Sequence, residues 1–236
     1  MNIDLPFIWE SLVELLTAIP TTLAITAVSM LCGLAIGTVV ALIRMYKVPV
    51  LHSVAASYVT FIRGTPMLTH LLLIYFGLPL IVDALSAQFG WPFRSVNIPM
   101  ITFAYISFSI TAGAYLSEVV RSGLQAVDKG QIEAAYSIGM TTRQAISRIV
   151  FPQAFAILLP SLSNSTISML HGSTLVFTVS VVDINAKSQI IASSNWKFFE
   201  AYIAAAAIYW GLTILIERLT AIVEKRINIY NRGGVT

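Results

Sequence analysis

Five long stretches without a charged side chain constrain this chain more than any other feature. A helix needs roughly 20 apolar residues to cross a hydrocarbon core about 30 Å thick. The stretches are Leu15–Ile43, Gly64–Val82, Ser95–Ser117, Ile149–Val182 and Ala201–Ile216, and Trp196, Phe198 and Phe199 extend the last one upstream. We therefore predict an all-α membrane protein with about five transmembrane helices, arranged as a single domain over residues 1–236.

The composition supports this class and excludes several others. Hydrophobic residues form 57% of the chain and charged residues only 11%, about half the usual charged share of a soluble domain. The single cysteine, Cys32, lies in an apolar stretch, and no Cys or His residues have the spacing of a metal site. The net charge of +3 is better explained by membrane topology than by a nucleic-acid partner. We expect no metal, no cofactor in this chain and no nucleic acid.

The basic residues predict the orientation in the membrane. With the N-terminus outside, residues 44–63, residues 118–148 and the C-terminus become cytoplasmic loops. Cytoplasmic loops carry an excess of Lys and Arg. The cytoplasmic set holds Arg44, Lys47, Arg63, Arg121, Lys129, Arg143, Arg148, Arg218, Lys225, Arg226 and Arg232, and the outer set holds Arg94, Lys187 and Lys197. The split of 11 to 3 favours an N-out, C-in topology.

The fourth uncharged stretch, Ile149–Val182, is longer than one straight crossing requires. It contains Pro160, Gly172 and the polar run SNSTIS at residues 163–168. We expect a helix that is broken, or that is followed by a second short segment at membrane depth. Irregular backbone at that depth is tolerated only where protein or a polar cavity shelters it.

Residues 131–154, QIEAAYSIGMTTRQAISRIVFPQA, are the most polar passage in the middle of the chain. Gly139 permits a left-handed helix cap, and Thr141 and Gln144 have the spacing of a capping box. The spacing of one helical face is shared by Ile132, Ala135, Tyr136, Gly139 and Met140. We predict two short cytoplasmic helices over about residues 131–148 that meet at Gly139. The periodicity alone fits an amphipathic helix on the membrane surface equally well.

A family resemblance bears on this alternative. The run Glu133-Ala134-Ala135, then Gly139, then Ile149-Val150-Phe151-Pro152 matches the signature EAA-x3-G-x9-I-x-L-P of ATP-binding-cassette importer permeases, with Phe151 in place of Leu. FIRGTPMLTHLLLIYFGLP (61–79) and AGAYLSEVVRSGLQAVDKGQIEAAYSIGM (112–140) resemble the branch of that family that transports polar amino acids. Looser matches extend over nearly the whole chain.

The resemblance implies a type I importer fold in a bacterial cytoplasmic membrane. It implies that the passage forms coupling helices that dock on separate ATPase subunits, which bind the ATP. The implied coupling residues are Glu133, Ala134, Ala135, Gly139, Ile149 and Pro152. Further partners implied are a second permease chain, identical or different, and an extracytoplasmic solute-binding protein. The implied function is import of an amino acid by alternating access.

Polar groups at membrane depth are candidates for contact with substrate, although Ser and Thr there often form hydrogen bonds between helices. The candidates are Tyr115, Asn164, Ser168, His171, Ser173 and Thr174. Relatives often carry Lys-Asp-Thr-Ser-Leu where this chain has His171-Gly172-Ser173-Thr174-Leu175, so their acid is replaced by Gly172. This difference favours a polar zwitterionic or sulfur-containing amino acid, such as cystine, over a cationic one.

Two other classes of function remain as alternatives. A membrane-embedded hydrolase could pair His171 with a serine, but the chain has no GxSxG elbow to support it. A secondary transporter or channel is disfavoured because no inverted repeat or intramembrane pair of acids is visible. The chain also lacks the P-loop pattern GxxxxGK[ST], so we expect a transport subunit without its own ATPase site.

Overall fold

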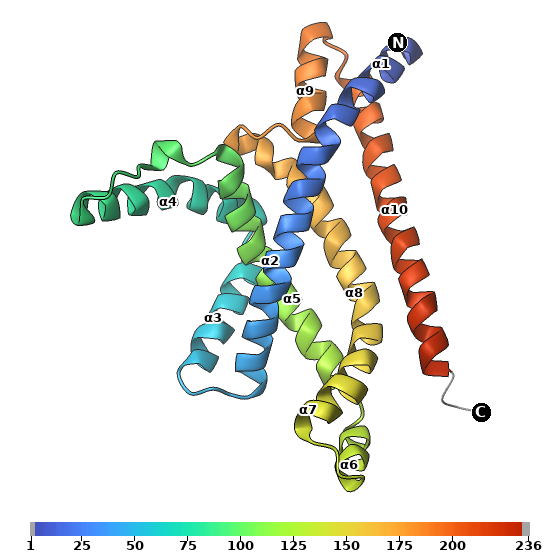
Figure 1. Ribbon diagram of the computed structural model, residues 1–236. Helices are drawn as coiled ribbons and strands as arrows, with labels where there is room; N and C mark the ends of the chain where they lie inside the picture. Colours follow the sequence, from blue (N-terminus) through green and yellow to red (C-terminus); the bar gives the residue numbers. More distant parts are fainter. Residues whose placement is uncertain (1–2, 233–236) are drawn as a thin grey trace.

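The structure, a computed structural model, describes residues 3–232 and the side chains of residues 3–227. The ends of the predicted 1–236 domain and the side chain of Arg232 lie outside the described part. The helices are α1 (Leu5–Leu15), η1 (Leu16–Ala18), α2 (Ile19–Met45), α3 (Leu51–Gly64), α4 (Met67–Phe89), η2 (Ser95–Asn97), α5 (Met100–Gln125), α6 (Lys129–Ser137), α7 (Thr142–Ala145), η3 (Ile146–Val150), α8 (Phe151–Gly172), η4 (Ser173–Val179), α9 (Ile184–Asn195) and α10 (Phe198–Arg232), as Figure 1 shows.

Five helical segments within residues 3–232 are long and apolar enough to cross a membrane. They are Leu5–Met45, Met67–Phe89, Met100–Gln125, Thr142–Val179 and Phe198–Ile227. Each overlaps one of the uncharged stretches of the sequence. The prediction of an all-α membrane protein with about five transmembrane helices is therefore confirmed.

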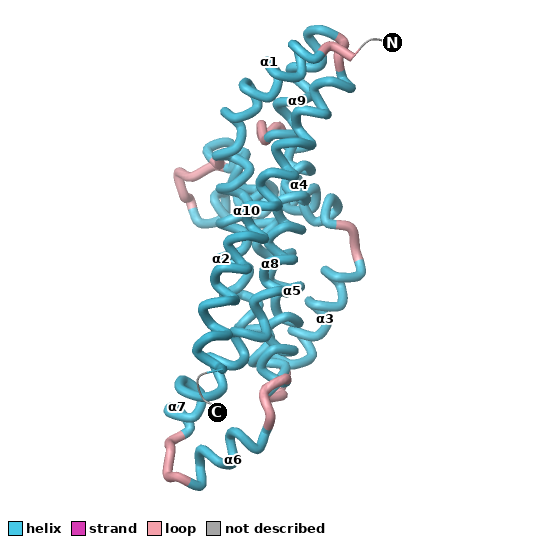
Figure 2. Tube along the Cα trace, turned by 90° about the vertical axis from the view of Figure 1, so that its right-hand side faces the viewer, coloured by secondary structure: helices cyan, strands magenta, loops and turns pink. Residues whose placement is uncertain are grey.

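The helices α2 and α5 form the centre of the molecule and make its most extensive contact. Helix α8 packs against both, and α10 packs against α8, α9 and α1. Helix α4 extends sideways from this bundle (Figure 1). The N-terminal end of the chain and the α6–α7 segment lie at opposite ends of the molecule in both views (Figures 1 and 2).

Glycines allow the central helices α2 and α5 to approach closely. A Cβ atom built on Gly33 would lie 2.5 Å from the Cβ of Ala112, and one built on Gly37 would lie 2.8 Å from the backbone nitrogen of Ser117. A Cβ atom built on Gly113 of α5 would lie 2.7 Å from the Cγ2 atom of Ile36 on α2. Small residues four apart allow such contacts between membrane helices, where dispersion and packing supply most of the attraction.

Much of the two segments predicted to lie between spans, residues 44–63 and 118–148, is helical. Helix α3 occupies residues 51–64, where Ala55, Val59 and Ile62 have helical spacing and are buried. Helix α5 continues past Ser117 to Gln125. A search for long uncharged stretches misses α3 because its run over residues 48–62 is too short to cross a membrane. It misses the end of α5 because Glu118 ends the stretch without ending the helix.

The predicted irregularity of the fourth span lies at its end rather than at its proline. Helix α8 continues through Pro160 to Gly172, and the backbone then tightens into the 3-10 segment η4. Ser180 follows in a left-handed conformation, and the chain turns into α9. The second short segment expected after the span is therefore η4 and the turn that follows it.

Asp183, together with the next residue, links three helices beyond the end of the fourth span. Its carboxylate caps α9 by accepting the N–H of Ala186 at 2.8 Å, and it accepts the hydroxyl of Tyr209 from α10 at 3.0 Å. The N–H of Ile184 donates to the hydroxyl of Thr22 on α2. Burial raises the pKa of the Asp183 carboxyl, and these hydrogen bonds oppose the shift.

Candidate functional site

The predicted pair of short helices is present at the end of the molecule opposite the N-terminus. Helix α6 begins after Asp128, whose carboxylate accepts the N–H of Gly130 at 2.6 Å. It ends in a Schellman motif, because Met140 N–H donates to Ala135 C=O and Gly139 N–H donates to Tyr136 C=O. Gly139 has φ of 81°, which is the left-handed cap that the sequence predicted.

The second short helix begins at the predicted capping box. The backbone N–H of Thr141 donates to the side chain of Gln144 at 2.9 Å, and Gln144 N–H donates to the Thr141 hydroxyl. The helix does not end before the fourth span. It passes through the π-turn η3, where Phe151 N–H donates to Ile146 C=O. Pro152 follows, and its missing N–H removes one ordinary helical bond at this point.

We call residues 128–150 the α6–α7 knob. Its signature residues separate into exposed and packed groups. Glu133, Ala134 and Gly139 are exposed, whereas Ala135 is 1% exposed and packs inside the knob. Ile149 and Pro152 are half-buried where the knob joins α8. The knob also exposes apolar side chains, among them Ile138 at 75%, so it presents an acidic group beside apolar surface.

A cavity of about 360 Å³ lies where α2, α4, α5 and α8 meet. Its lining residues are Met30, Met67, Thr111, Ala112, Tyr115, Leu116, Asn164, Ser165, Ser168 and Met169. Tyr115, Asn164 and Ser168 are exposed, so the cavity is open on their side. None of these lining residues is an acid, a lysine, an arginine or a histidine.

Three of the six predicted pathway residues line this cavity, namely Tyr115, Asn164 and Ser168. The other three lie elsewhere. The Nε2 atom of His171 is 3.2 Å from the Thr213 hydroxyl, and its ring meets Tyr209 edge-on. Ser173 and Thr174 lie in η4 and donate to nearby backbone carbonyls. Both residues lie beyond the point, after Gly172, where α8 gives way to 3-10 geometry, and neither lines the cavity.

The sequence analysis missed the methionines of the cavity wall. Three of the chain's seven methionines line it: Met30, Met67 and Met169. Gly172 lies close to Met67, because a Cβ atom built on it would lie 3.0 Å from the Met67 sulfur. Where relatives carry an acid, this chain therefore has no side chain, and the position lies next to a thioether of the cavity wall. Methionine is flexible and polarizable, and it accommodates irregular apolar groups.

Charged side chains gather around Glu118 between the cavity and the knob. Its carboxylate accepts from Arg44 at 2.5 Å and from Arg121 at 2.7 Å, and Arg63 lies 3.8 Å away. The Arg63 guanidinium also lies over the ring of Tyr115, 5.9 Å from its centroid. Arg63 is one of the basic residues that predicted the orientation, and its place in this cluster with Glu118 was not predicted from the sequence.

Comparison with known families identifies the chain. A family described as the binding-protein-dependent transport system inner membrane component matches residues 33–229. The chain belongs to this family. The permease is 38% identical to the probable amino-acid ABC transporter permease protein PatM of Vibrio harveyi, over 97% of its own length and 98% of PatM. It is 34% identical to the L-cystine transport system permease protein TcyL of Bacillus subtilis (strain 168), over 95% of its length and 91% of TcyL.

Solved structures agree with this assignment. The permease superposes on an amino acid ABC transporter crystallised with histidines with a TM-score of 0.79 at 35% identity, over 96% of its length and 100% of that chain. A permease of the MetNI methionine transporter shares the fold, with a TM-score of 0.72 at 18% identity. The prediction of an amino-acid ABC importer permease with a type I fold in a bacterial cytoplasmic membrane is therefore confirmed.

Proposed function

We propose that this permease imports a polar or sulfur-containing amino acid without net charge, with cystine as the leading candidate. The cavity carries this proposal. Its wall combines hydroxyl and amide groups with three thioethers, and no side chain in that wall could neutralise a cationic substrate side chain. Its volume of about 360 Å³ suits a small molecule, since ligand pockets commonly measure roughly 300–1,000 Å³. The L-cystine assignment of the relative TcyL supports the same substrate class.

The α6–α7 knob is proposed as the docking element for separate ATPase subunits, which bind the ATP. It is compact, it is held by two helix caps, and it exposes Glu133 beside apolar surface. In this role Glu133 pairs with a basic group of the ATPase, while Ala134 and Gly139 allow close approach. Ala135, Ile149 and Pro152 act by holding the knob together and joining it to α8.

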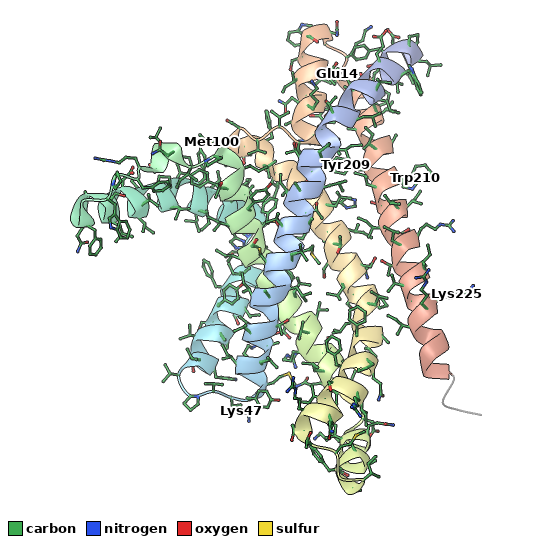
Figure 3. All side chains as sticks on the ribbon, viewed as in Figure 1. Glu14, Lys47, Met100, Tyr209, Trp210 and Lys225 are labelled. Carbon is green, nitrogen blue, oxygen red and sulfur yellow. The ribbon has the colours of Figure 1, made fainter. Side chains whose placement is uncertain are left out.

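The proposed orientation places the knob in the cytoplasm and the N-terminus outside. The knob and the N-terminal end lie at opposite ends of the molecule, and Figure 3 shows Glu14 near the N-terminal end and Lys47 near the other. An excess of basic residues on the knob side fits the cytoplasmic face of a membrane. An extracytoplasmic solute-binding protein would then deliver the substrate at the end formed by α1 and α9.

A second permease chain, identical or different, would complete the pathway as two such chains move together by alternating access. The cavity is open at Tyr115, Asn164 and Ser168. Helix α4 carries exposed apolar side chains such as Phe76 and Leu80, which need lipid or protein beside them. Closure of the cavity by a second chain explains both features.

The substrate class is tested by uptake into proteoliposomes that hold the permease, its ATPase and its binding protein. Among labelled cystine, methionine, glutamine, serine, arginine and lysine, we expect ATP-dependent uptake of a member without net charge. Replacing Asn164 with alanine should lower that uptake about tenfold, the effect of one lost substrate hydrogen bond worth about 1.4 kcal/mol. Preferred uptake of arginine or lysine would contradict the substrate class. Uptake that needs no ATP would favour a channel or secondary transporter instead.

Docking on the knob is tested by exchanging single residues and measuring how much ATPase purifies with the permease. Glu133→Arg and Gly139→Leu should each weaken ATPase binding about tenfold or more, as expected for a central interface residue worth over about 1.4 kcal/mol. Glu10→Arg is the matched control, because it reverses an exposed charge at the opposite end of the molecule. Full ATPase binding and normal uptake by both knob variants would show that docking occurs elsewhere.

A further inference from the structure

A chain of hydrogen bonds connects the cavity wall to the break between α3 and α4. The Thr65 hydroxyl donates to Phe61 C=O at 2.7 Å, and its oxygen lies 2.6 Å from Nε2 of His70. The other ring nitrogen of His70, Nδ1, lies 3.1 Å from the hydroxyl of Thr111, a cavity residue. His70 is 4% exposed and Thr111 is 1% exposed. The bond between His70 and Thr111 is therefore shielded from water, whereas the Thr65 end of the chain is partly exposed.

The chemistry of these groups fixes the direction of each bond. The starting point is the bond that the Thr65 hydroxyl donates to Phe61 C=O, which uses the only hydrogen of that hydroxyl. The Thr65 oxygen must then accept from Nε2–H of His70. A buried imidazole without a carboxylate partner stays neutral, because burying an unpaired charge costs several kcal/mol. Its Nδ1 atom is then an acceptor, and the Thr111 hydroxyl donates to it.

Thr111 can therefore offer only oxygen lone pairs to the cavity. The two serines of the wall also use their hydroxyl hydrogens within their own helix. Ser165 donates to Ser161 C=O, and Ser168 donates to Asn164 C=O. All three hydroxyls of Ser and Thr in the wall thus present acceptors, although no carboxylate lines the cavity. The serines satisfy a carbonyl of their own helix, whereas Thr111 depends on His70.

We propose that Thr111 accepts a hydrogen bond from the ammonium group of the transported amino acid, and that His70 is the positioning residue that keeps Thr111 an acceptor. An ammonium group has three N–H donors and no acceptor. A wall of acceptor oxygens suits it where an acid is absent. The Tyr115 hydroxyl and the Asn164 amide supply donor hydrogens of the same cavity for the substrate carboxylate. This inference rests on the proposed transport function.

The test measures ligand binding to the permease–ATPase complex in nanodiscs without the binding protein, so that only the permease selects the ligand. The probes are labelled cystine, methionine, glutamine and serine, each competed by its N-acetyl derivative, in which the ammonium is converted to an amide. We expect Thr111→Val to weaken binding of the amino acid about tenfold and to leave binding of the N-acetyl derivative unchanged. Thr111→Ser should bind both ligands as the parent complex does.

His70 is tested by the ratio of the two affinities, which a purely structural role would not change. His70→Leu should reduce the preference for the free amino acid severalfold. His70→Gln should retain most of it, because an amide offers one donor and one acceptor. The inference would be overturned if Thr111→Val and His70→Leu weakened binding of both ligands equally, or left the ratio of the two affinities unchanged. Uptake by the parent complex would still support the proposed function in that case. If no probe binds or is taken up by the parent complex, the proposed function and this inference both fail.

Discussion

Replacing Gly37 with alanine is expected to disrupt the packing of α2 on α5 and with it the folded permease. The new Cβ atom would lie 2.8 Å from Ser117 N and 2.9 Å from Gly113 O. Both are backbone atoms, so no flexible side chain can move aside, and the two central helices would have to separate. Overpacking of a tight core costs about 1–3 kcal/mol and sometimes more. We expect the upper part of this range for alanine and loss of the folded protein for leucine.

The measurement is the yield of monodisperse permease in detergent, followed by its thermal unfolding. Gly211→Ala is the matched control, because this glycine also lies in a membrane-spanning helix and no atom lies within 4 Å of its built Cβ. The control should unfold at the parent temperature or slightly above it, since alanine favours helix by up to about 1 kcal/mol over glycine. Parent-like stability of Gly37→Leu would show that α2 and α5 do not pack this closely.

Replacing Glu118 with glutamine is expected to destabilise the permease by about 3 kcal/mol. The side chain of Glu118 is 20% exposed, and it is the shared partner of Arg44, Arg121 and, more distantly, Arg63. Glutamine keeps the size but leaves three guanidinium groups close together without an anion. Removal of one partner from a largely buried ion pair typically costs about 3–5 kcal/mol. The lower end applies here because the cluster is partly open to solvent.

Two controls separate this effect from a general loss of charge. Asp4→Asn breaks the pair between Asp4 and Lys197, whose side chains are 35% and 40% exposed, and should cost less than about 1 kcal/mol. The double variant Glu118→Gln, Arg121→Gln should recover part of the lost stability, because one unpaired cation is removed. Thermal unfolding in detergent checks all three variants. Equal stability of Glu118→Gln and Asp4→Asn would mean that the arginines find other partners.

The spans and the knob could be predicted because their signals are local. Apolar length is enough to detect a transmembrane helix, and the Thr141–Gln144 box and Gly139 specify helix ends within a few residues. Helix α3 was missed because its uncharged run, residues 48–62, is too short to cross a membrane. The last turns of α5 were missed because Glu118 and Arg121, which pair with each other, interrupt the apolar run. The signal for the α2–α5 contact, two glycines four residues apart in Gly33 and Gly37, was present in the sequence and was not used.

The cavity was only half predictable for a different reason. Polar residues within a span can be recognised as candidates from the sequence, so Tyr115, Asn164 and Ser168 were predicted. Met67 and Met169 look like ordinary membrane residues, and only the meeting of α4 and α8 makes them part of one wall. Ser173 and Thr174 lie beyond the end of α8, in the 3-10 segment η4, and do not line the cavity. The bond between His70 and Thr111 joins residues 41 apart and leaves no local trace in the sequence.

The unbroken helical path from Thr142 through η3 into α8 has a mechanical consequence. Asn164 lies 22 residues beyond Thr142, which is about 33 Å at 1.5 Å per residue. The knob and the part of the cavity wall formed by α8 therefore belong to one continuous helical segment. If the ATPase docks on the knob as proposed, a tilt of the knob is expected to move Asn164 and Ser168 as well. The π-turn η3 and Pro152 mark a place within this segment where an ordinary helical hydrogen bond is missing, so bending is expected there first.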